Sequence, residues 1–181
     1  YLAHPDVRGV IEDEYGNILI ASYGGGIYYW NHQADVFSSL NYSTYNHSSH
    51  IHYFNKTKDG KIWLAGKNNL YVFQGNLDNL VHTFNLSLPS YDIGTISNII
   101  NINEGSYLLS SSTGLFIASV ERGVISKAQI NNKRGAFATN GPNKTIYISD
   151  GKKSIIRISS ENFDVTSRLT LPTSEKTNIS S

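Results

Sequence analysis

A short motif recurs four times along this chain at nearly equal spacing, and few folds are compatible with such a repeat. In each copy a tight-turn cluster rich in Asn, Asp or Gly is followed by two short apolar runs with a small polar loop between them. The turns are anchored at Gly16, Gly60, Gly105 and Lys144, which lie 44, 45 and 39 residues apart. A period of this length with four short strands per unit is typical of β-propeller blades.

The repeat predicts an all-β chain of four four-stranded blades, at about residues 6–44, 48–90, 94–132 and 135–172. Aromatic residues make up 12% of the chain, which favours strands over helices. Because the apolar runs are nearly continuous, we expect both faces of each blade to be buried between its neighbours. In chain order, the expected strands are 7–12, 18–20, 27–30 and 36–40; 51–55, 62–64, 70–73 and 80–84; 96–101, 107–109, 115–117 and 124–130; and 137–139, 146–148, 155–158 and 163–169.

The last residues predict the start of a fifth blade. Residues 177–180 resemble 94–97, where the third unit begins, and Ile179 follows Phe137 by 42 residues, which places the start of the fifth blade at 177–181. An open stack of blades leaves unpaired edges and an unfilled axis, which a closed ring removes. We therefore expect residues 1–181 to form a single partial propeller domain, a fragment of a larger ring of the seven-bladed type. Closure with four blades, or by self-association, is the alternative.

Gly24, Gly25 and Gly26 raise the question of a phosphate-binding loop. Such a loop needs a helix after the glycines, with its N-terminus facing the phosphate, whereas residues 27–30 are aromatic and apolar like a strand. Glycine also serves where a loop needs a positive φ or a close approach of two backbones. The sequence therefore predicts an inter-strand loop.

Charge and cysteine content exclude several partners and sites. Fifteen Lys and Arg residues against fourteen Asp and Glu give a net charge of +1, so no global field attracts nucleic acid or an acidic membrane surface. The absence of Cys excludes disulfides, thiolate nucleophiles and cysteine-ligated metals. No apolar run approaches the roughly 18 residues of a membrane-spanning helix. We expect neither direct nucleic-acid binding nor a membrane segment in this chain.

Two polar clusters invite a catalytic or metal-site interpretation. His50 and His52 share one face of an expected strand and His47 is near, but a zinc site needs a further ligand. The Glu-Asp-Glu run at 12–14 resembles the paired carboxylates of glycosidases, yet adjacent acids at a hairpin turn are more often solvated turn formers. The sequence predicts no catalytic residue, no metal site and no cofactor.

Trp30 and Trp63 are candidate platforms for stacking against sugar rings. Trp63 lies in the middle of an expected strand of the repeat, where packing between blades is the better explanation. The serines at 110–112 lie in no nucleophile-elbow context, because the chain lacks a Gly-x-Ser-x-Gly motif.

Ligand-binding residues are expected in the loops on one axial face of the propeller, because loops presented by a rigid scaffold usually carry the site. These loops run from the second to the third strand of each blade and from the outer strand to the next inner strand. Their flat aromatics, hydrogen-bonding groups and cations suit an oligosaccharide, including an acidic one. The candidate ligand-binding residues are Tyr23, Tyr45, His50, Lys67, Tyr91 and Arg134.

The first two units resemble a known repeat. Residues 58–66 read KDGKIWLAG and are followed by NLYVF at 69–73, and residues 12–22 and 25–29 follow the same pattern. Both units resemble the two-component regulator propeller repeat, and the resemblance extends over about residues 6–160.

This resemblance implies a periplasmic sensor fragment from a hybrid two-component system of gut-type Bacteroidetes, which sense glycans and regulate genes for their use. In that family a membrane helix, a kinase and a DNA-binding module follow the sensor, so histidine kinase activity belongs to the parent chain and not to this fragment. The resemblance also implies a homodimer of the parent protein, in which ligand binding favours one packing of the propellers.

Two other functions stay open. A propeller lyase or glycosidase acting on glycans needs a pair of inward acids, and only Asp92 is expected on the axial face. The second alternative function is that of a protein-interaction propeller of the WD40 type, although this sequence lacks the Gly-His and Trp-Asp signatures of those repeats.

Overall fold

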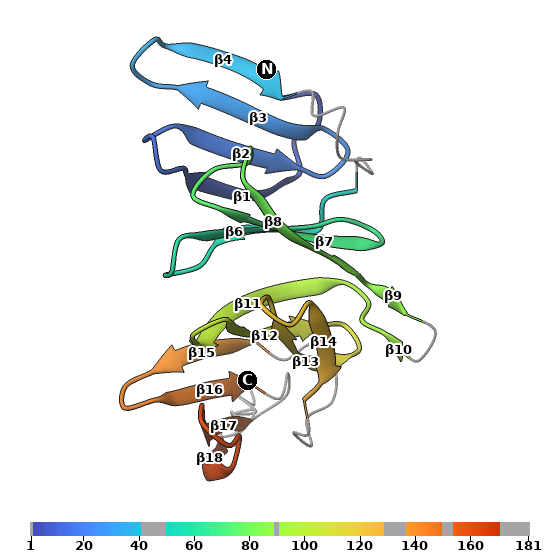
Figure 1. The fold of residues 1–181 in the computed structure, drawn as a ribbon, viewed down its shortest axis with the longest axis vertical. Coiled ribbons are helices and arrows are strands. Elements are labelled where there is room, and N and C mark those ends of the chain that lie inside the picture. Colours follow the sequence, from blue (N-terminus) through green and yellow to red (C-terminus); the bar gives the residue numbers. More distant parts are fainter. Residues whose placement is uncertain (1, 41–49, 89–90, 129–136, 150–153, 171–181) are drawn as a thin grey trace, which may run out of the picture.

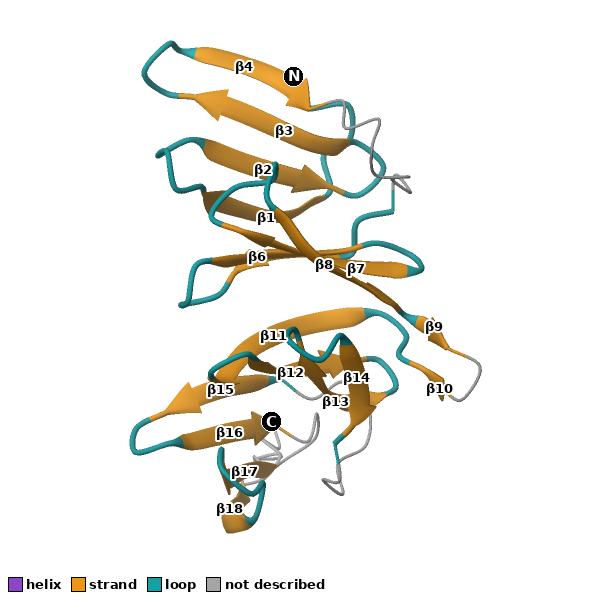
Figure 2. Cartoon of the chain, viewed as in Figure 1, coloured by secondary structure: helices purple, strands orange, loops and turns teal. Residues whose placement is uncertain are grey.

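Four antiparallel sheets of four strands each are stacked along the length of the molecule (Figure 1). The computed structural model describes residues 2–40, 50–88, 91–128, 137–149 and 154–170. These residues form strands, turns and loops and no helix (Figure 2). Accordingly, no helix that could cross a membrane is found among them.

Within each sheet the strands are hydrogen-bonded in chain order. The four sheets, called here the first to fourth blades, consist of β1 (Val7–Glu12), β2 (Ile18–Ser22), β3 (Gly26–Asn31) and β4 (Val36–Leu40); β5 (Tyr53–Lys56), β6 (Lys61–Ala65), β7 (Asn69–Gln74) and β8 (Leu80–Asn85); β11 (Ile96–Asn103), β12 (Ser106–Ser111), β13 (Gly114–Ser119) and β14 (Val124–Lys127); and β15 (Ala138–Gly141), β16 (Thr145–Ser149), β17 (Ser154–Ser159) and β18 (Val165–Thr170).

This architecture confirms the all-β partial propeller of four four-stranded blades, and β1 and β4 have the predicted bounds. Two other strands begin two residues later than predicted. β5 begins at Tyr53 rather than at residue 51, because its ladder with β6 starts at the pair Tyr53 and Ala65. β18 begins at Val165 rather than at residue 163, because Phe163 has a positive φ of 62° and belongs to the preceding turn.

The connection between the second and third blades contains a two-stranded ribbon that the repeat did not predict. It consists of β9 (Ser87–Leu88) and β10 (Tyr91–Asp92). Elsewhere, β14 ends at Lys127, before its predicted limit at residue 130. The predicted start of a fifth blade at 177–181 lies outside the described residues, and the blade limits stay a prediction.

The turn between the first two strands explains the anchors of the repeat. Gly16, Gly60 and Gly105 have φ values of 81°, 81° and 68°, a region that favours glycine. In the fourth blade Asn143 and Lys144 have φ values of 55° and 54°. Two consecutive residues in the left-handed region are typical of a type I′ hairpin turn. The fourth turn therefore reverses the chain without glycine.

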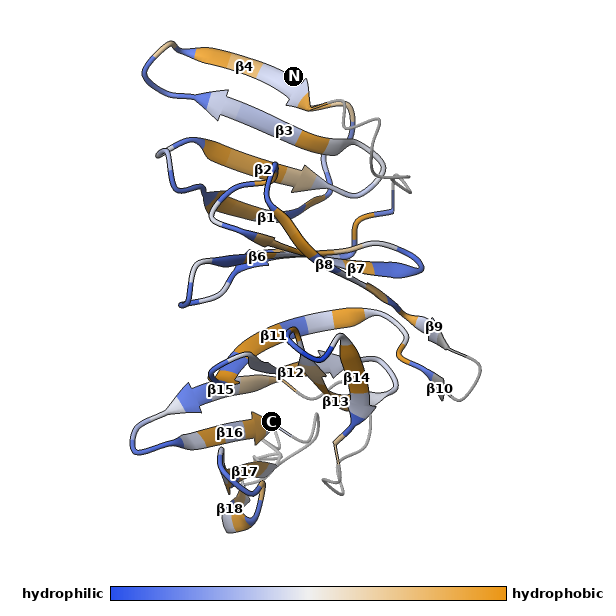
Figure 3. Ribbon diagram, in the orientation of Figure 1, coloured by the Kyte–Doolittle hydropathy of each residue, from blue (hydrophilic) through white to orange (hydrophobic). Residues whose placement is uncertain are grey.

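Packing between blades buries both faces of the second blade. Alternate residues of a strand point to opposite faces, so Ile62 and Leu64 of β6 belong to a cluster with Leu19 of the first blade, whereas Trp63 belongs to a cluster with Tyr107 of the third. Each of these side chains is at most 2% exposed. Apolar residues accordingly concentrate on the strands and polar residues on the turns (Figure 3).

The inner strands β1, β5, β11 and β15 pack successively against one another along the stack. In two blades, the side chain at the same position of the repeat forms a hydrogen bond with the next inner strand. In the second blade the hydroxyl of Tyr53 accepts a bond of 3.1 Å from the backbone amide of Ile99 on β11. In the third blade the side-chain amide of Asn98 donates to the carbonyl oxygen of Ala138 on β15.

We expect Tyr53→Phe to lower the free energy of unfolding by about 1 to 2 kcal/mol, because it leaves the buried Ile99 amide without its acceptor. Urea unfolding followed by circular dichroism measures the change. Tyr15→Phe is the matched control, since Tyr15 is 67% exposed. Equal unfolding midpoints for the two variants would show that the bond between blades contributes nothing.

Candidate functional site

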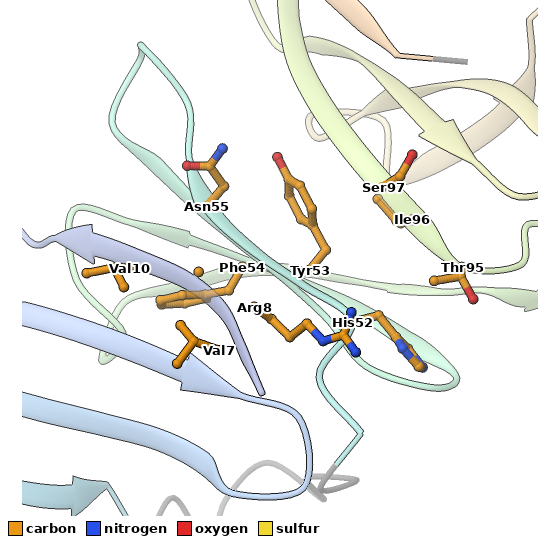
Figure 4. Close-up of a pocket in the computed structure, with 11 residues that line it drawn as sticks. Val7, Arg8, Val10, His52, Tyr53, Phe54, Asn55, Thr95, Ile96 and Ser97 are labelled. Atoms are coloured by element: carbon orange, nitrogen blue, oxygen red, sulfur yellow. The ribbon is translucent and has the colours of Figure 1, made fainter. Parts of the chain in front are cut away.

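A cleft of about 560 Å³ lies along the inner strands of the first three blades (Figure 4). Its walls are residues 7–10 of β1, residues 52–55 of the second blade and residues 95–97 of the third. Apolar groups such as Val10 and Phe54 alternate there with polar ones. A cleft of this size and mixed lining suits a small ligand that has both apolar and hydroxyl-bearing faces.

Three cleft residues occupy equivalent positions of the repeat. In each blade one residue of the inner strand pairs with the second strand at the same point of the repeat: Val10, Phe54 and Ile99. The cleft residue two positions before it is Arg8 in the first blade, His52 in the second and Ser97 in the third. In β1 and β11 the register shifts between Val7 and Gly9 and between Ile96 and Asn98, so that Arg8 and Ser97 are the extra residues of β-bulges. Bulges re-aim side chains and are frequent beside binding sites.

The charged end of the cleft is formed by Arg8 and His52. Their side chains extend toward the same end, whereas Asn55 lies at the other end and the side chain of Tyr53 extends across to β11 (Figure 4). The two residues come from neighbouring blades, so the charged end depends on the contact between the first and second blades.

Tyr23 holds this end together. Its ring centroid lies 5.2 Å from that of His50 and 5.5 Å from that of His52, and the guanidinium carbon of Arg8 lies 5.2 Å from the same centroid. The ring of His4 lies 6.4 Å away. One tyrosine thus contacts side chains from the N-terminal segment, from β1 and from the segment before β5.

The loop that carries Tyr23 contains Gly24 and Gly25, and Gly26 begins β3. The Tyr23 amide donates to the Asp6 carbonyl at 2.8 Å, and the Ser22 hydroxyl donates to the His4 carbonyl at 2.6 Å. A side chain on Gly25 would lie 2.9 Å from Ser22 Oγ and 3.2 Å from the His4 nitrogen, so glycine allows this close approach. A strand follows the glycines, and the prediction of an inter-strand loop is confirmed.

The electrostatics of the cluster are asymmetric. Arg8 Nη2 donates to Asp6 Oδ2 at 2.6 Å, an ion pair whose side chains are 38% and 41% exposed. Burial lowers the pKa of His52 below its ordinary value, and the electrostatic effects of Arg8 and His50 lower it further. His52 is therefore held in its neutral form at neutral pH.

The depressed pKa of His52 predicts that acid weakens the fold. As the pH falls below about 6.5, the unfolded chain takes up a proton at His52 before the folded chain does. The free energy of unfolding therefore decreases until the pH passes below the folded-state pKa. Unfolding midpoints at pH 7.5 and 5.0 measure this decrease, which we expect to be smaller in His52→Gln and unchanged in the exposed-site control His32→Gln. Equal pH dependence in all three proteins would contradict it.

The structure brings two of the predicted site residues, Tyr23 and His50, into contact. Lys67 is exposed in the loop between β6 and β7, and Tyr91 lies in β10. Tyr45 and Arg134 lie outside the described residues. The ligand-binding role of all these residues stays a prediction.

The two clusters singled out for chemistry have other roles in the structure. His50 and His52 contact Tyr23, and no group of three His, Cys, Asp or Glu side chains within the described ranges is placed to hold a metal ion. Asp13 Oδ1 accepts bonds of 2.8 Å from the amides of Tyr15 and Asn17. Asp13 is thus a turn former, but it is buried rather than solvated as expected.

Comparison with known proteins places the fold. No protein-family model and no curated protein sequence matches the chain. It is similar to the extracellular domain of the hybrid two component system BT4673 from B. thetaiotaomicron, at 17% identity and a TM-score of 0.69 over 92% of this chain and 23% of that one. It is also similar to the extracellular domain of BT3049, a hybrid two component system from the same organism. The identity is 13% and the TM-score is 0.69, over 88% of this chain and 23% of that one.

The WD40 β-propeller domain of Doa1 gives 17% identity and a TM-score of 0.59 over 87% of this chain and 51% of that one. The chain thus spans about a quarter of the length of the two extracellular domains and about half of the WD40 chain. At these identities the similarities establish a propeller fold.

Proposed function

We propose that the chain is a ligand-sensing part of the periplasmic domain of a hybrid two-component sensor, that it responds to a glycan, and that it has no catalytic activity of its own. The observation that carries the proposal is the cleft whose charged end gathers Arg8, His50 and His52 around Tyr23. The similarity to extracellular domains of hybrid two component systems supports the sensor role and the extracytoplasmic location.

The lining of the cleft favours an oligosaccharide. Pyranose rings present apolar C–H faces and a rim of hydroxyl groups, and pockets that bind them combine apolar walls with placed polar groups. Val7 and Val10, which are 41% and 58% exposed, supply apolar surface, while Asn55, Thr95 and Ser97 supply hydrogen-bonding groups on facing walls.

The lining also favours binding over cleavage. Glycoside hydrolysis uses two carboxylates on either side of the scissile bond. None of the residues of the described chain that line the cleft is Asp or Glu. Asp92, the one acid that the sequence placed on the axial face of the propeller, accepts a bond of 2.8 Å from the Gly94 amide.

The homodimer of the parent protein stays a prediction.

Titration of the purified chain with a panel of neutral and acidic oligosaccharides by calorimetry, with chromatography of the mixtures, tests the proposal. We expect saturable binding and no shorter products. Tyr23→Ala should weaken binding at least about tenfold, because Tyr23 contacts Arg8, His50 and His52. Tyr15→Ala is the control, since Tyr15 lies in the turn between β1 and β2, at the other end of the strands.

Release of shorter products would replace the sensor proposal with a glycan-cleaving enzyme. Absence of binding across the whole panel would contradict glycan recognition by this chain. Equal affinity of the wild type and Tyr23→Ala, with both folded, would move the site elsewhere.

A further inference from the structure

We infer that the end of the cleft formed by Arg8 and His52 binds a carboxylate, so that the glycan recognised is an acidic one. The inference rests on the proposed function and adds the chemical class of the ligand. It follows from the geometry of the charged end and from the groups that surround it.

Arg8 and His52 provide donors from two walls of the cleft. Both side chains contact Tyr23, at 5.2 Å and 5.5 Å from its ring centroid, and both extend toward the same end (Figure 4). A guanidinium group presents a planar set of N–H donors that matches a carboxylate, and an imidazolium adds a further charged donor. A carboxylate between the two is therefore bonded from both the first and the second blade.

Apart from Asp6, the side chains around this end belong to one arginine and three histidines. His4 comes from the N-terminal segment, Arg8 from β1, and His50 and His52 from the segment before β5. Residues 95–97 on the facing wall bring Thr, Ile and Ser, none of which titrates in the physiological range. Protonation of His52 is opposed by burial and by Arg8 and His50, and a bound anion offsets the repulsion from these two side chains.

Asp6 is the carboxylate that the structure places against this cluster. It accepts a bond of 2.6 Å from Arg8 Nη2, and both side chains are partly exposed. Arg8 is thus already oriented to bind a carboxylate. Asp6 also competes with a ligand for Arg8, and replacing it should strengthen the binding of an acidic sugar, an effect that a merely structural pair would not give.

Binding is expected to depend on pH through His52. A carboxylate beside the ring raises the pKa of His52, whereas in the free protein burial, Arg8 and His50 lower it. Binding therefore takes up a proton at pH values between the free and the bound pKa. The affinity for the acidic sugar rises as the pH falls through this interval and levels off below it.

Calorimetric titration with trigalacturonate and with its methyl ester, at pH 5.5 and pH 7.5, tests the inference. The two probes share one sugar backbone and differ in the charge of the carboxyl groups. We expect the acid to bind about tenfold more tightly than the ester at pH 5.5. The preference should shrink several-fold at pH 7.5.

Four variants locate the effect. Arg8→Gln should remove most of the preference for the acid, and His52→Gln should remove its pH dependence. Asp6→Asn should raise the affinity for the acid about two- to fivefold. Lys58→Gln is the matched charge control, because Lys58 lies in the turn between β5 and β6, at the opposite end of β5 from His52. Thermal unfolding midpoints establish that each variant is folded.

Equal binding of the acid and the ester to the wild type would overturn the carboxylate inference and leave glycan binding intact. Binding of neutral sugars from the panel, without binding of either uronate probe, would also overturn the carboxylate inference and leave glycan binding intact. Failure of the entire panel contradicts the proposed function itself. A Lys58→Gln loss equal to that of Arg8→Gln would replace the subsite with a general charge effect.

Discussion

Trp63→Ala is expected to lower the free energy of unfolding by about 3 to 5 kcal/mol, the usual range for truncation of a buried aromatic side chain. None of the surface of Trp63 is exposed. Its ring packs against that of Tyr107 on the next blade, with centroids 4.6 Å apart and planes at 60°. Its Nε1 donates to Thr57 Oγ1 at 3.2 Å. The truncation leaves a cavity between the second and third blades and removes a buried hydrogen bond.

Urea unfolding followed by far-ultraviolet circular dichroism measures this loss without depending on tryptophan fluorescence. Trp63→Phe keeps most of the ring contact. It should lower the free energy of unfolding by less, about 1 to 3 kcal/mol, chiefly because the N–H group is missing and the side chain is smaller. Trp30→Ala is the matched control and should cost about 1 kcal/mol or less, since Trp30 is 38% exposed. Similar losses for Trp63→Ala and Trp30→Ala would refute the blade-packing role of Trp63.

The fold was predictable because the turn chemistry and the hydrophobic runs agree in every unit. The glycine turns at Gly16, Gly60 and Gly105 gave the period, and the two-sided burial of strands such as β6 follows from their continuous apolar sequence. Asn143 and Lys144 form the corresponding turn in another way, so the fourth unit lacks the glycine that marks the turn in the other three. The ribbon β9–β10 has no counterpart in the period and could not be foreseen from it.

The candidate site was predictable only in part. Loop position alone indicated Tyr23 and His50, which do meet. Arg8 was missed because it lies within a predicted inner strand, where alternation decides the side-chain direction, and a bulge between Val7 and Gly9 breaks that alternation. Alignment of the repeats was the usable signal, since it places Arg8 and His52 at equivalent positions. The approach of two blades around Tyr23 is tertiary and leaves no local pattern.

Gly9→Ala is expected to destabilise the contact between the first two blades by about 1 to 3 kcal/mol, the usual cost of overpacking. A Cβ atom on Gly9 would lie 2.0 Å from the carbonyl oxygen of Phe54 and 2.9 Å from its carbonyl carbon. The obstacle is backbone, so β1 and β5 must move apart. At the equivalent position the second and third blades carry Tyr53 and Asn98, whose side chains reach the next inner strand by hydrogen bonds. In the first blade glycine allows direct contact instead.

Hydrogen exchange shows whether this effect is local. In Gly9→Ala the amides of β1 and β5 should exchange faster, whereas those of β12 and β16 should keep their wild-type rates, because each blade contacts only its neighbours. Val10→Ala, at a site 58% exposed on the same strand, should leave all four strands protected. Since Arg8 moves with β1, Gly9→Ala should also weaken glycan binding, although residue 9 bears no polar side chain. Wild-type stability and exchange in Gly9→Ala would mean that the first two inner strands do not approach as closely as the structure shows.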